Sequence, residues 1–310
     1  MDKKTPSRYQ LIAAFAAVYI IWGSTYLAIK IAIISFPPFL MAGIRFLISS
    51  AIIFGVARFF SKEKIKLKFW KDSFIIGGAL LLGGNGGVVW AEQFVPSGLT
   101  ALIVATVPIW MVLFDWLHPH GNKPTLKIII GLILGFAGLL IMISPSSILH
   151  GENVNLYGAG ALLIATCSWA AGSVYSRKAD MPKSKFLTVA MEMFAGGVLL
   201  VLAGTILGEW NNFHITKLSS QSIIAFFYLI ASGSVIGFTA YIWLLEAAGP
   251  AKASTYAYVN PVIAVLLGWL ILGEEISMRI LLSASFIIVG IVFIITKKEF
   301  FRLKKKVVNE

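Results

Sequence analysis

Three ionisable residues interrupt long apolar stretches of the sequence and are the first candidates for chemistry. They are Arg45, Glu92 and Glu192. A charged group is costly to bury among apolar residues, so it usually marks an ion pair, a proton relay or a ligand site. Arg45 has the chemistry to bind a carboxylate, and Glu192 has the chemistry to carry a proton. Structural pairing explains Arg45 and Glu192 equally well.

Polar side chains occur at two further places in the apolar sequence. Asn85 lies in a glycine-rich run (77–87), and Tyr256 and Asn260 lie within about one turn of Pro261. A buried amide needs a hydrogen-bond partner, which a neighbouring helix, water or a ligand would supply. These three polar residues are therefore candidates for binding a substrate.

Four residues could bend or interrupt the helices that carry these side chains. Gly84 and Gly237 lie in glycine-containing runs, and Pro108 and Pro261 lie within apolar stretches. Proline removes a backbone hydrogen bond inside a helix, and glycine weakens a helix. We expect all four as hinge positions. Close helix packing is the more common role of membrane glycines, and a purely structural kink explains either proline alone equally well.

The remaining reactive side chains exclude several kinds of chemistry. The one cysteine, Cys167, lies in an apolar run, so neither a disulfide framework nor a structural zinc site is expected. The histidines fall between apolar stretches, and no suitably spaced carboxylate completes a metal site with His118 and His120. Neither a CxxC nor a P-loop pattern occurs in the sequence. We therefore expect no metal, no cofactor and no enzymatic activity.

The elements that would position the candidate residues are long apolar helices. Hydrophobic residues make up 58% of the 310 residues and charged residues 13%, about half the charged share of a soluble domain. A membrane-crossing helix needs about 20 apolar residues, and ten stretches meet this requirement. The predicted fold class is all-α integral membrane. The ten predicted transmembrane helices are 10–30, 38–60, 72–91, 98–117, 126–144, 156–176, 186–207, 222–245, 253–272 and 278–296.

The basic residues predict the orientation of these helices. If the N-terminus is cytoplasmic, 22 of the 26 Lys and Arg residues fall on that side, three fall on the other side, and Arg45 lies inside a span. Positive residues concentrate on the cytoplasmic side of membrane proteins. We expect a multi-pass protein of the inner or plasma membrane with both termini in the cytoplasm. The charge favours contact with anionic lipid over nucleic-acid binding.

The two halves of the sequence resemble each other. Similar residues recur at shifts of 147 to 153 positions, as in the pairs Trp22 and Trp169, Gly84 and Gly237, and Pro108 and Pro261. We predict two repeats, 1–147 and 148–310, the second ending in a basic cytoplasmic tail. Each repeat would hold five spans, so the second copy would cross the membrane in the opposite sense. Inverted-topology repeats are the architecture of many secondary transporters.

Several short sequences resemble a known family. The string Trp22-Gly23-Ser24-Thr25-Tyr26, the pair Arg45-Phe46, the run 96–103, and later Asn260-Pro261 and Leu272-Gly273-Glu274 resemble an EamA-type domain. Over essentially its whole length, the chain resembles the ten-helix exporters of the drug/metabolite transporter superfamily. The resemblance implies a transporter that moves a small metabolite, such as an amino acid or a drug-like compound, out of the cell. It also implies that Trp22 and Trp169, with Thr25 nearby, lie on a cavity wall where they could stack on a substrate.

A secondary exporter of small organic metabolites that works by alternating access is the function that these expectations support together. Its partners would be a small-molecule substrate, protons as a candidate coupling ion, and anionic lipid. A passive facilitator or an exchanger of small solutes is the alternative. A membrane enzyme is less favoured, because no predicted span carries a His–carboxylate cluster.

Overall fold

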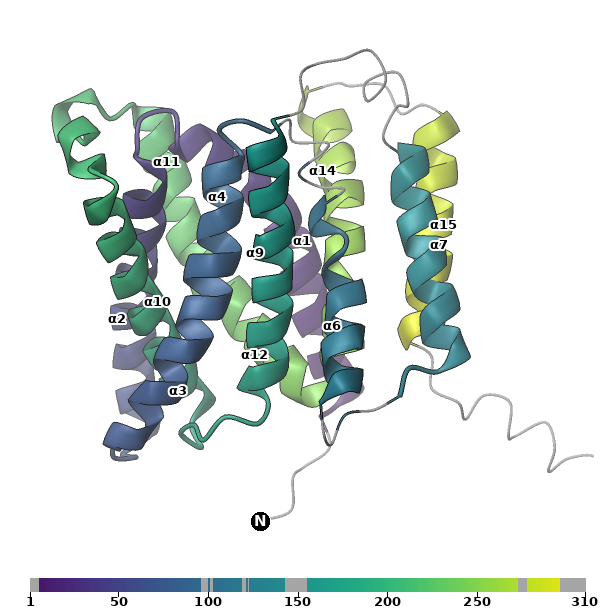
Figure 1. Cartoon of the computed structure of the whole chain (residues 1–310), viewed down its shortest axis with the longest axis horizontal. Coiled ribbons are helices and arrows are strands. Elements are labelled where there is room, and N and C mark those ends of the chain that lie inside the picture. The colour runs from purple at the N-terminus through teal and green to yellow at the C-terminus, as the bar shows by residue number, and fades with distance from the viewer. Residues whose placement is uncertain are drawn as a thin grey trace, which may run out of the picture.

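The structure is a bundle of helices (Figure 1). The computed structural model describes residues 6–95, 100, 103–118, 121, 123–142, 155–272 and 278–295, and every regular element within these residues is helical. The long helices share one common direction, as helices that cross a membrane do (Figure 1). The all-helical membrane fold class that the apolar sequence predicted agrees with this architecture.

The elements follow one another along the chain with short connections. The first half contains α1 (Arg8–Ala32), α2 (Pro38–Phe60), α3 (Leu67–Gly77), the π-helix η1 (Gly78–Gly86), α4 (Gly87–Ala91), α6 (Val107–Leu117) and α7 (Leu126–Met142). The second half contains α9 (Leu156–Ser176), α10 (Lys185–Ile206), the short 3-10 helices η2 (Glu209–Asn212) and η3 (Ile215–Lys217), α11 (Ser220–Tyr228), the π-helix η4 (Leu229–Phe238), α12 (Thr239–Ala247), α13 (Pro250–Ala253), α14 (Tyr256–Leu272) and α15 (Met278–Ile295).

Six of the described helices are long and apolar enough to cross a membrane. Two of the six are composite: α3, η1 and α4 form one helix over Leu67–Ala91, and α11, η4 and α12 form another over Ser220–Ala247. Three shorter apolar helices are Val107–Leu117, Leu126–Ile141 and Leu281–Ile295. The number of ten membrane crossings therefore stays a prediction.

Local sequence explains how several helices begin. At the start of α1, Ser7 and Gln10 form a capping box in which each side chain accepts a hydrogen bond from the other residue's backbone. At the start of α2, Pro38 occupies the first turn, where its missing N–H leaves no hydrogen bond unmade. The Glu209 carboxylate accepts from the next two amides, Phe39 N–H at 3.1 Å and Leu40 N–H at 2.8 Å. This contact joins the second half of the chain to the first.

The two halves of the chain are interleaved. The most extensive helix contacts are those of α2 with α10 and of α7 with α15, and η1 packs on α9. Glycine allows these backbones to approach closely, because a Cβ there would lie under 3.2 Å from the facing helix. Facing glycines are Gly43 and Gly197, Gly77 and Gly196, and Gly131 and Gly290. The α7–α15 pair lies at one edge of the bundle (Figure 1).

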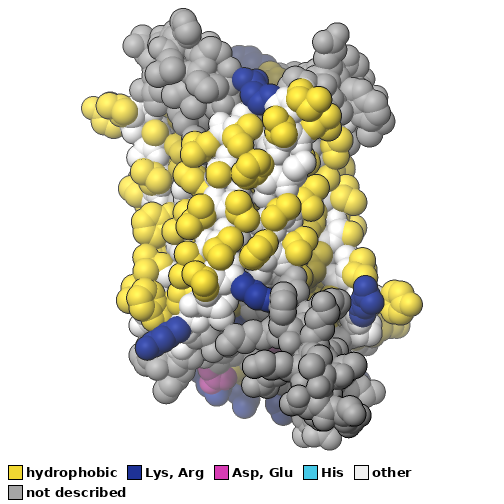
Figure 2. Space-filling view, turned by 90° about the vertical axis from the view of Figure 1, so that its right-hand side faces the viewer, with side chains coloured by type: hydrophobic (Ala, Val, Ile, Leu, Met, Phe, Trp, Pro, Cys, Tyr) yellow, Lys and Arg dark blue, Asp and Glu magenta, His cyan; other side chains and the backbone are white. Residues whose placement is uncertain are grey.

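The outside of the bundle is apolar. Figure 2, which faces the α7–α15 edge, shows hydrophobic side chains over the middle of the surface and Lys and Arg toward its two ends. Ile133 of α7 is 63% exposed, and Ile288 of α15 is 58% exposed. Such a surface is favourable against lipid and unfavourable in water.

The two ends of the bundle differ in the connections that they carry. The N-terminal end of α1 and the connections 61–66 and 177–184 share one end (Figure 1), and Glu63 accepts a hydrogen bond from the Lys183 N–H there. We call this end the basic face, because the sequence predicts that 22 of the 26 Lys and Arg residues lie on the side of the membrane that these segments share. The other end is called the opposite face.

Candidate solute-binding cavity

A cavity lies between the two halves of the chain. Its walls come from α1, α2, η1 and α4 of the first half, with residues just before α6, and from α9, η4 and α14 of the second half. Its volume is about 90 Å³. One water molecule needs about 10–15 Å³ by this measure, so the cavity has room for several waters or a small organic group.

The six residues predicted from the sequence to bind substrate all line this one cavity. They are Trp22, Thr25, Asn85, Trp169, Tyr256 and Asn260. Arg45 and Gly84 also line it. The structure therefore brings these residues together, and their role in binding stays a prediction.

Further lining residues were missed by the sequence reasoning. They include Tyr26, Phe46, Thr166 and Phe238. A usable signal existed for two of them. Tyr26 lies four positions after Trp22, and Thr166 lies three positions before Trp169. Residues three or four apart share one face of a helix, so each lies on the same face as a tryptophan that was identified.

Four aromatic rings pack together beside the cavity. Trp22 lies with its ring centroid 5.6 Å from that of Trp169, 5.0 Å from Tyr241 and 4.8 Å from Tyr256. Trp169 Nε1 donates to Tyr241 Oη at 2.9 Å, and Tyr241 Oη also bonds the Ser173 hydroxyl at 2.6 Å. We call Trp22, Trp169, Tyr241 and Tyr256 the aromatic cluster. Trp22, Trp169 and Tyr256 of this cluster line the cavity, and Tyr241 does not.

Glycines in the two π-helices make room for the two tryptophans. A Cβ at Gly84 of η1 would lie 2.8 Å from Trp169 Cε3, and a Cβ at Gly237 of η4 would lie 2.5 Å from Trp22 Nε1. Both distances are shorter than carbon or nitrogen atoms tolerate. Each tryptophan thus packs on the glycine of a π-helix from the other half of the chain.

The π-helices also offer backbone carbonyls to neighbouring side chains. Trp22 Nε1 donates to the Gly233 carbonyl of η4 at 3.1 Å, and Ser168 Oγ donates to the Ala79 carbonyl of η1 at 2.8 Å. A change from i→i+4 to i→i+5 bonding disturbs the regular pairing of backbone groups and is frequent at functional sites. Here the side-chain donors of α1 and α9 satisfy the exposed carbonyls.

Two amides and one guanidinium are among the polar groups of the cavity wall. Arg45 Nη2 donates to Asn85 Oδ1 at 3.0 Å, and the Arg45 guanidinium lies 4.2 Å from the centroid of the Phe46 ring. With its amide oriented to satisfy its neighbours, Asn260 donates to the carbonyl of Tyr256 at 3.0 Å. In the same orientation it also donates to the Tyr19 carbonyl of α1 at 3.3 Å, so Asn260 is held in place by its own helix and by α1.

Two ionisable candidates do not line the cavity. Glu192 of α10 is fully buried, and neither of its carboxylate oxygens has a hydrogen-bond partner among the described residues. Glu92 directly follows the last residue of α4, and its Oε2 is likewise buried without a described partner. Burial raises the pKa of Glu92 to about 8, and the nearby charge of Lys30 acts in the opposite direction.

The two prolines differ from each other in position. Pro261 lies inside α14, as predicted. The prediction that Pro108 lies inside a helix is wrong, because Pro108 occupies the first turn of α6. The chain turns at Ala105 and Thr106, directly before α6, and the first turn of a helix tolerates proline because its amides have no intrahelical partner. Neither proline lines the cavity, and Gly237 borders it only through Trp22.

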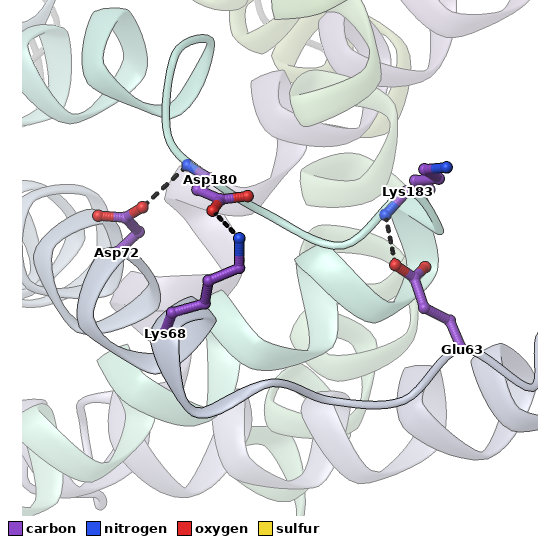
Figure 3. Close-up of polar contacts among 5 residues, drawn as sticks. All are labelled: Glu63, Lys68, Asp72, Asp180 and Lys183. Carbon is purple, nitrogen blue, oxygen red and sulfur yellow. Dashed lines mark hydrogen bonds and ion pairs between the residues drawn. The ribbon is translucent and has the colours of Figure 1, made fainter.

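Polar contacts join the two halves of the chain at the basic face (Figure 3). The Glu63 carboxylate accepts from the backbone N–H of Lys183 at 3.1 Å, and the Asp72 carboxylate accepts from the backbone N–H of Asp180 at 2.8 Å. Lys68 forms an ion pair with Asp180. We call these five residues the basic-face clasp. It holds the connection 177–184 of the second half against the first half.

Comparison with known proteins gives consistent results. Residues 9–144 and 156–296 each match the EamA-like transporter family. The chain is 40% identical to the "Uncharacterized inner membrane transporter YedA" of Escherichia coli K12 over 95% of this chain and 93% of that protein. It is 29% identical to the "Uncharacterized transporter YoaV" of Bacillus subtilis over 91% and 95% of the two chains. It is 22% identical to the "Probable amino-acid metabolite efflux pump" of Escherichia coli K12 over 88% and 91%.

A solved structure shares the fold. One crystal structure superposes with a TM-score of 0.75 at 18% sequence identity and covers 98% of this chain and 100% of its own. At this identity the similarity concerns the fold alone.

The contacts of the two π-helix glycines predict the effect of adding a methyl group there. Gly84→Ala and Gly237→Ala should each lower the free energy of unfolding by about 1–3 kcal/mol, because the new Cβ overlaps a tryptophan ring. Thermal unfolding of the purified proteins in one detergent measures this. Gly55→Ala is the matched control, since no atom lies within 4 Å of a Cβ there. Equal melting temperatures for all three variants would contradict the proposed packing.

Proposed function

Because the chain belongs to the EamA-like transporter family, we propose that it is a secondary transporter that exports small organic metabolites across the plasma membrane. Relatives that match almost its full length are named as transporters, which favours a transporter over an enzyme. One relative is named as an amino-acid metabolite efflux pump, which makes amino acids a reasonable first substrate class to test. The observation that carries the proposal is the cavity between the two halves, with its aromatic and polar wall.

Alternating access is the mechanism that we propose for this cavity. In this mechanism, solute that moves between the cavity and the basic face passes the aromatic cluster and the basic-face clasp, and both rearrange to let it enter. With the basic face in the cytoplasm, as the charge distribution favours, this rearrangement would load the cavity for export. The ring contacts and the backbone hydrogen bonds are individually modest, which suits a closure that opens repeatedly.

An inverted repeat would supply the two equivalent halves that alternating access needs. Support comes from two matched contacts, Trp22 with Gly237 and Trp169 with Gly84. The tryptophans lie 147 positions apart and the glycines 153 positions apart, as in the predicted repeats 1–147 and 148–310. We propose ten membrane crossings, five in each repeat, with both termini on the cytoplasmic side and basic residues against anionic lipid.

The proposed roles of the candidate residues follow from their positions. Trp22, Trp169 and Tyr256 would stack on the apolar part of the solute, and Thr25, Asn85 and Asn260 would line its path. Gly84, Gly237, Pro108 and Pro261 would be the places where the helices bend as the cavity opens to one side or the other. Gly84 and Gly237 belong to π-helices, Pro108 lies in the first turn of α6, and Pro261 lies inside α14.

Loss of an aromatic wall should reduce transport. Trp169→Ala should lower apparent substrate affinity about 5- to 150-fold, because a lost stacking or hydrogen-bonding contact is worth roughly 1–3 kcal/mol. The measurement is a metabolite-efflux and toxicity-resistance screen on cells that express the protein. Trp169→Phe, which keeps a ring, should retain more activity. Trp210→Ala, at an exposed tryptophan in η2, is the control. Wild-type efflux by Trp169→Ala at equal membrane abundance would refute the role of the cavity.

Two buried carboxyls are the candidates for proton coupling, and one variant of each distinguishes them. Glu192→Gln should retain solute binding but remove the pH dependence of efflux, because the amide keeps the shape and cannot carry the proton. Glu92 loses its proton as the pH rises through about 8, so Glu92→Gln would remove a pH dependence centred there. Efflux rates from pH 6 to pH 9 test both. Unchanged profiles in both variants would favour a facilitator or an exchanger.

A further inference from the structure

Arg45 is a buried cation without an anionic partner among the described residues. It is 4% exposed and lies seven residues past Pro38, about 10 Å along α2. Its Nη2 bonds the neutral amide of Asn85, and its Nε has no partner. Arg45 is also the only charged residue among the described residues that line the cavity.

No carboxylate among the described residues forms an ion pair with Arg45. Three of them form ion pairs with other basic residues, in the pairs Lys68 and Asp180, Arg177 and Asp115, and Lys185 and Glu246. Three others, Glu63, Asp72 and Glu209, accept hydrogen bonds from backbone amides. The two buried acids, Glu92 and Glu192, retain unbonded oxygens and make no ion pair with Arg45. A buried charge without an opposite charge nearby is strongly unfavourable. The buried Arg45 guanidinium therefore needs an anionic partner, and the described residues do not supply one.

We infer that the solute moved by this chain carries a carboxylate that pairs with Arg45 in the cavity. The inference rests on the proposed function and adds the chemical class of the substrate. The planar guanidinium matches a carboxylate with two parallel hydrogen bonds. Asn85 holds Nη2 in a fixed direction, and it makes no other hydrogen bond among the described residues, so its amide N–H groups remain to donate to the same carboxylate.

The size and charge of the cavity favour a carboxylate over a larger anion. A phosphate ester carries up to two charges near neutral pH, and the described lining offers one cation. The cavity is about 90 Å³, and Trp22, Trp169 and Tyr256 contribute aromatic rings to its wall. A small amphipathic acid fits this arrangement, with its carboxylate at α2 and its apolar part on the rings. Amino acids and simple organic acids share this chemistry.

Three small molecules of similar shape can show which charged group a solute needs in order to bind in the cavity. Leucine carries a carboxylate and an ammonium, 4-methylpentanoate carries the carboxylate alone, and 3-methylbutylamine carries the ammonium alone. Binding to the purified full-length protein in detergent micelles is measured by calorimetry. We expect both carboxylate probes to bind and the amine to fail. Tighter binding of leucine than of 4-methylpentanoate would identify amino acids as the better source of the carboxylate.

Variants at Arg45 distinguish a binding role from a structural role. Arg45→Gln should weaken the binding of both carboxylate probes about 10- to 150-fold, as expected for a hydrogen-bonded charge pair. The affinity of Arg45→Lys for both carboxylate probes should lie between those of the wild type and Arg45→Gln, because lysine keeps the positive charge and loses the two parallel N–H donors of the guanidinium. Arg58→Gln is the control on the same helix, since Arg58 bonds the Glu63 carbonyl away from the cavity. Without ligand, Arg45→Gln should melt at the wild-type temperature or above it, because a buried unpaired charge is removed.

Three results would overturn the inference. One is binding of the amine as tight as that of the carboxylates, or of the amine alone, which would leave the proposed transport function standing. The second is an unchanged affinity in Arg45→Gln. The third is failure of all three probes to bind the wild-type protein. A lowered melting temperature of ligand-free Arg45→Gln, together with wild-type affinity, would assign Arg45 to the fold.

Discussion

The close approach of each cavity tryptophan to a glycine in the other half of the chain is the contact on which the rest of the structure depends. Trp22 lies where a side chain at Gly237 would be, and Trp169 lies where a side chain at Gly84 would be. Only glycine permits this packing. The packing places the ring centroids of Trp22 and Trp169 5.6 Å apart. The aromatic cluster beside the cavity exists because these two glycines carry no Cβ. Lipid gives helices little hydrophobic reason to associate, so such close packing contributes much of the attraction between them.

The same two glycines belong to π-helices, which links the packing to the polarity of the cavity. The wider turn of a π-helix leaves backbone carbonyls for other donors, and Trp22 Nε1 and Ser168 Oγ fill this role at Gly233 and Ala79. In an apolar bundle each unmade hydrogen bond is costly, so these bonds fix the side chains that make them. Arg45, in contrast, keeps a buried Nε without a hydrogen-bond partner among the described residues. The cavity wall thus joins aromatic rings to a cation with free hydrogen-bonding capacity.

The sequence predicted most of the helices and part of the cavity wall, because long apolar stretches and the polar residues within them can be recognised in the sequence. The helix at Pro38–Phe60 was expected at the same residues, and Asn85 and Asn260 were identified as polar groups that need partners. The sequence could not predict contacts between distant segments. Tyr241, which bonds both Trp169 and Ser173, resembles any other membrane tyrosine in the sequence. The π-helical form of η1 and η4 and the hydrogen bonds of Glu63 likewise depend on neighbours far along the chain. Pro108 was misplaced because its apolar surroundings do not reveal the turn at Ala105 and Thr106.

Access to the cavity from each side of the membrane tests the central claim most directly. Val88 lines the cavity and is partly exposed, so Val88→Cys in a Cys167→Ala background places a small thiol there, and Lys66→Cys marks the basic face. Sealed vesicles of known orientation are treated with an impermeant thiol reagent from one side at a time. The account predicts that the thiol at 88 reacts from the opposite face, that it reacts from the basic face much more slowly than the thiol at 66, and that the vesicles stay sealed to small ions. Equally fast reaction from both faces, which a continuous pore would give, or no reaction from either face, would contradict it.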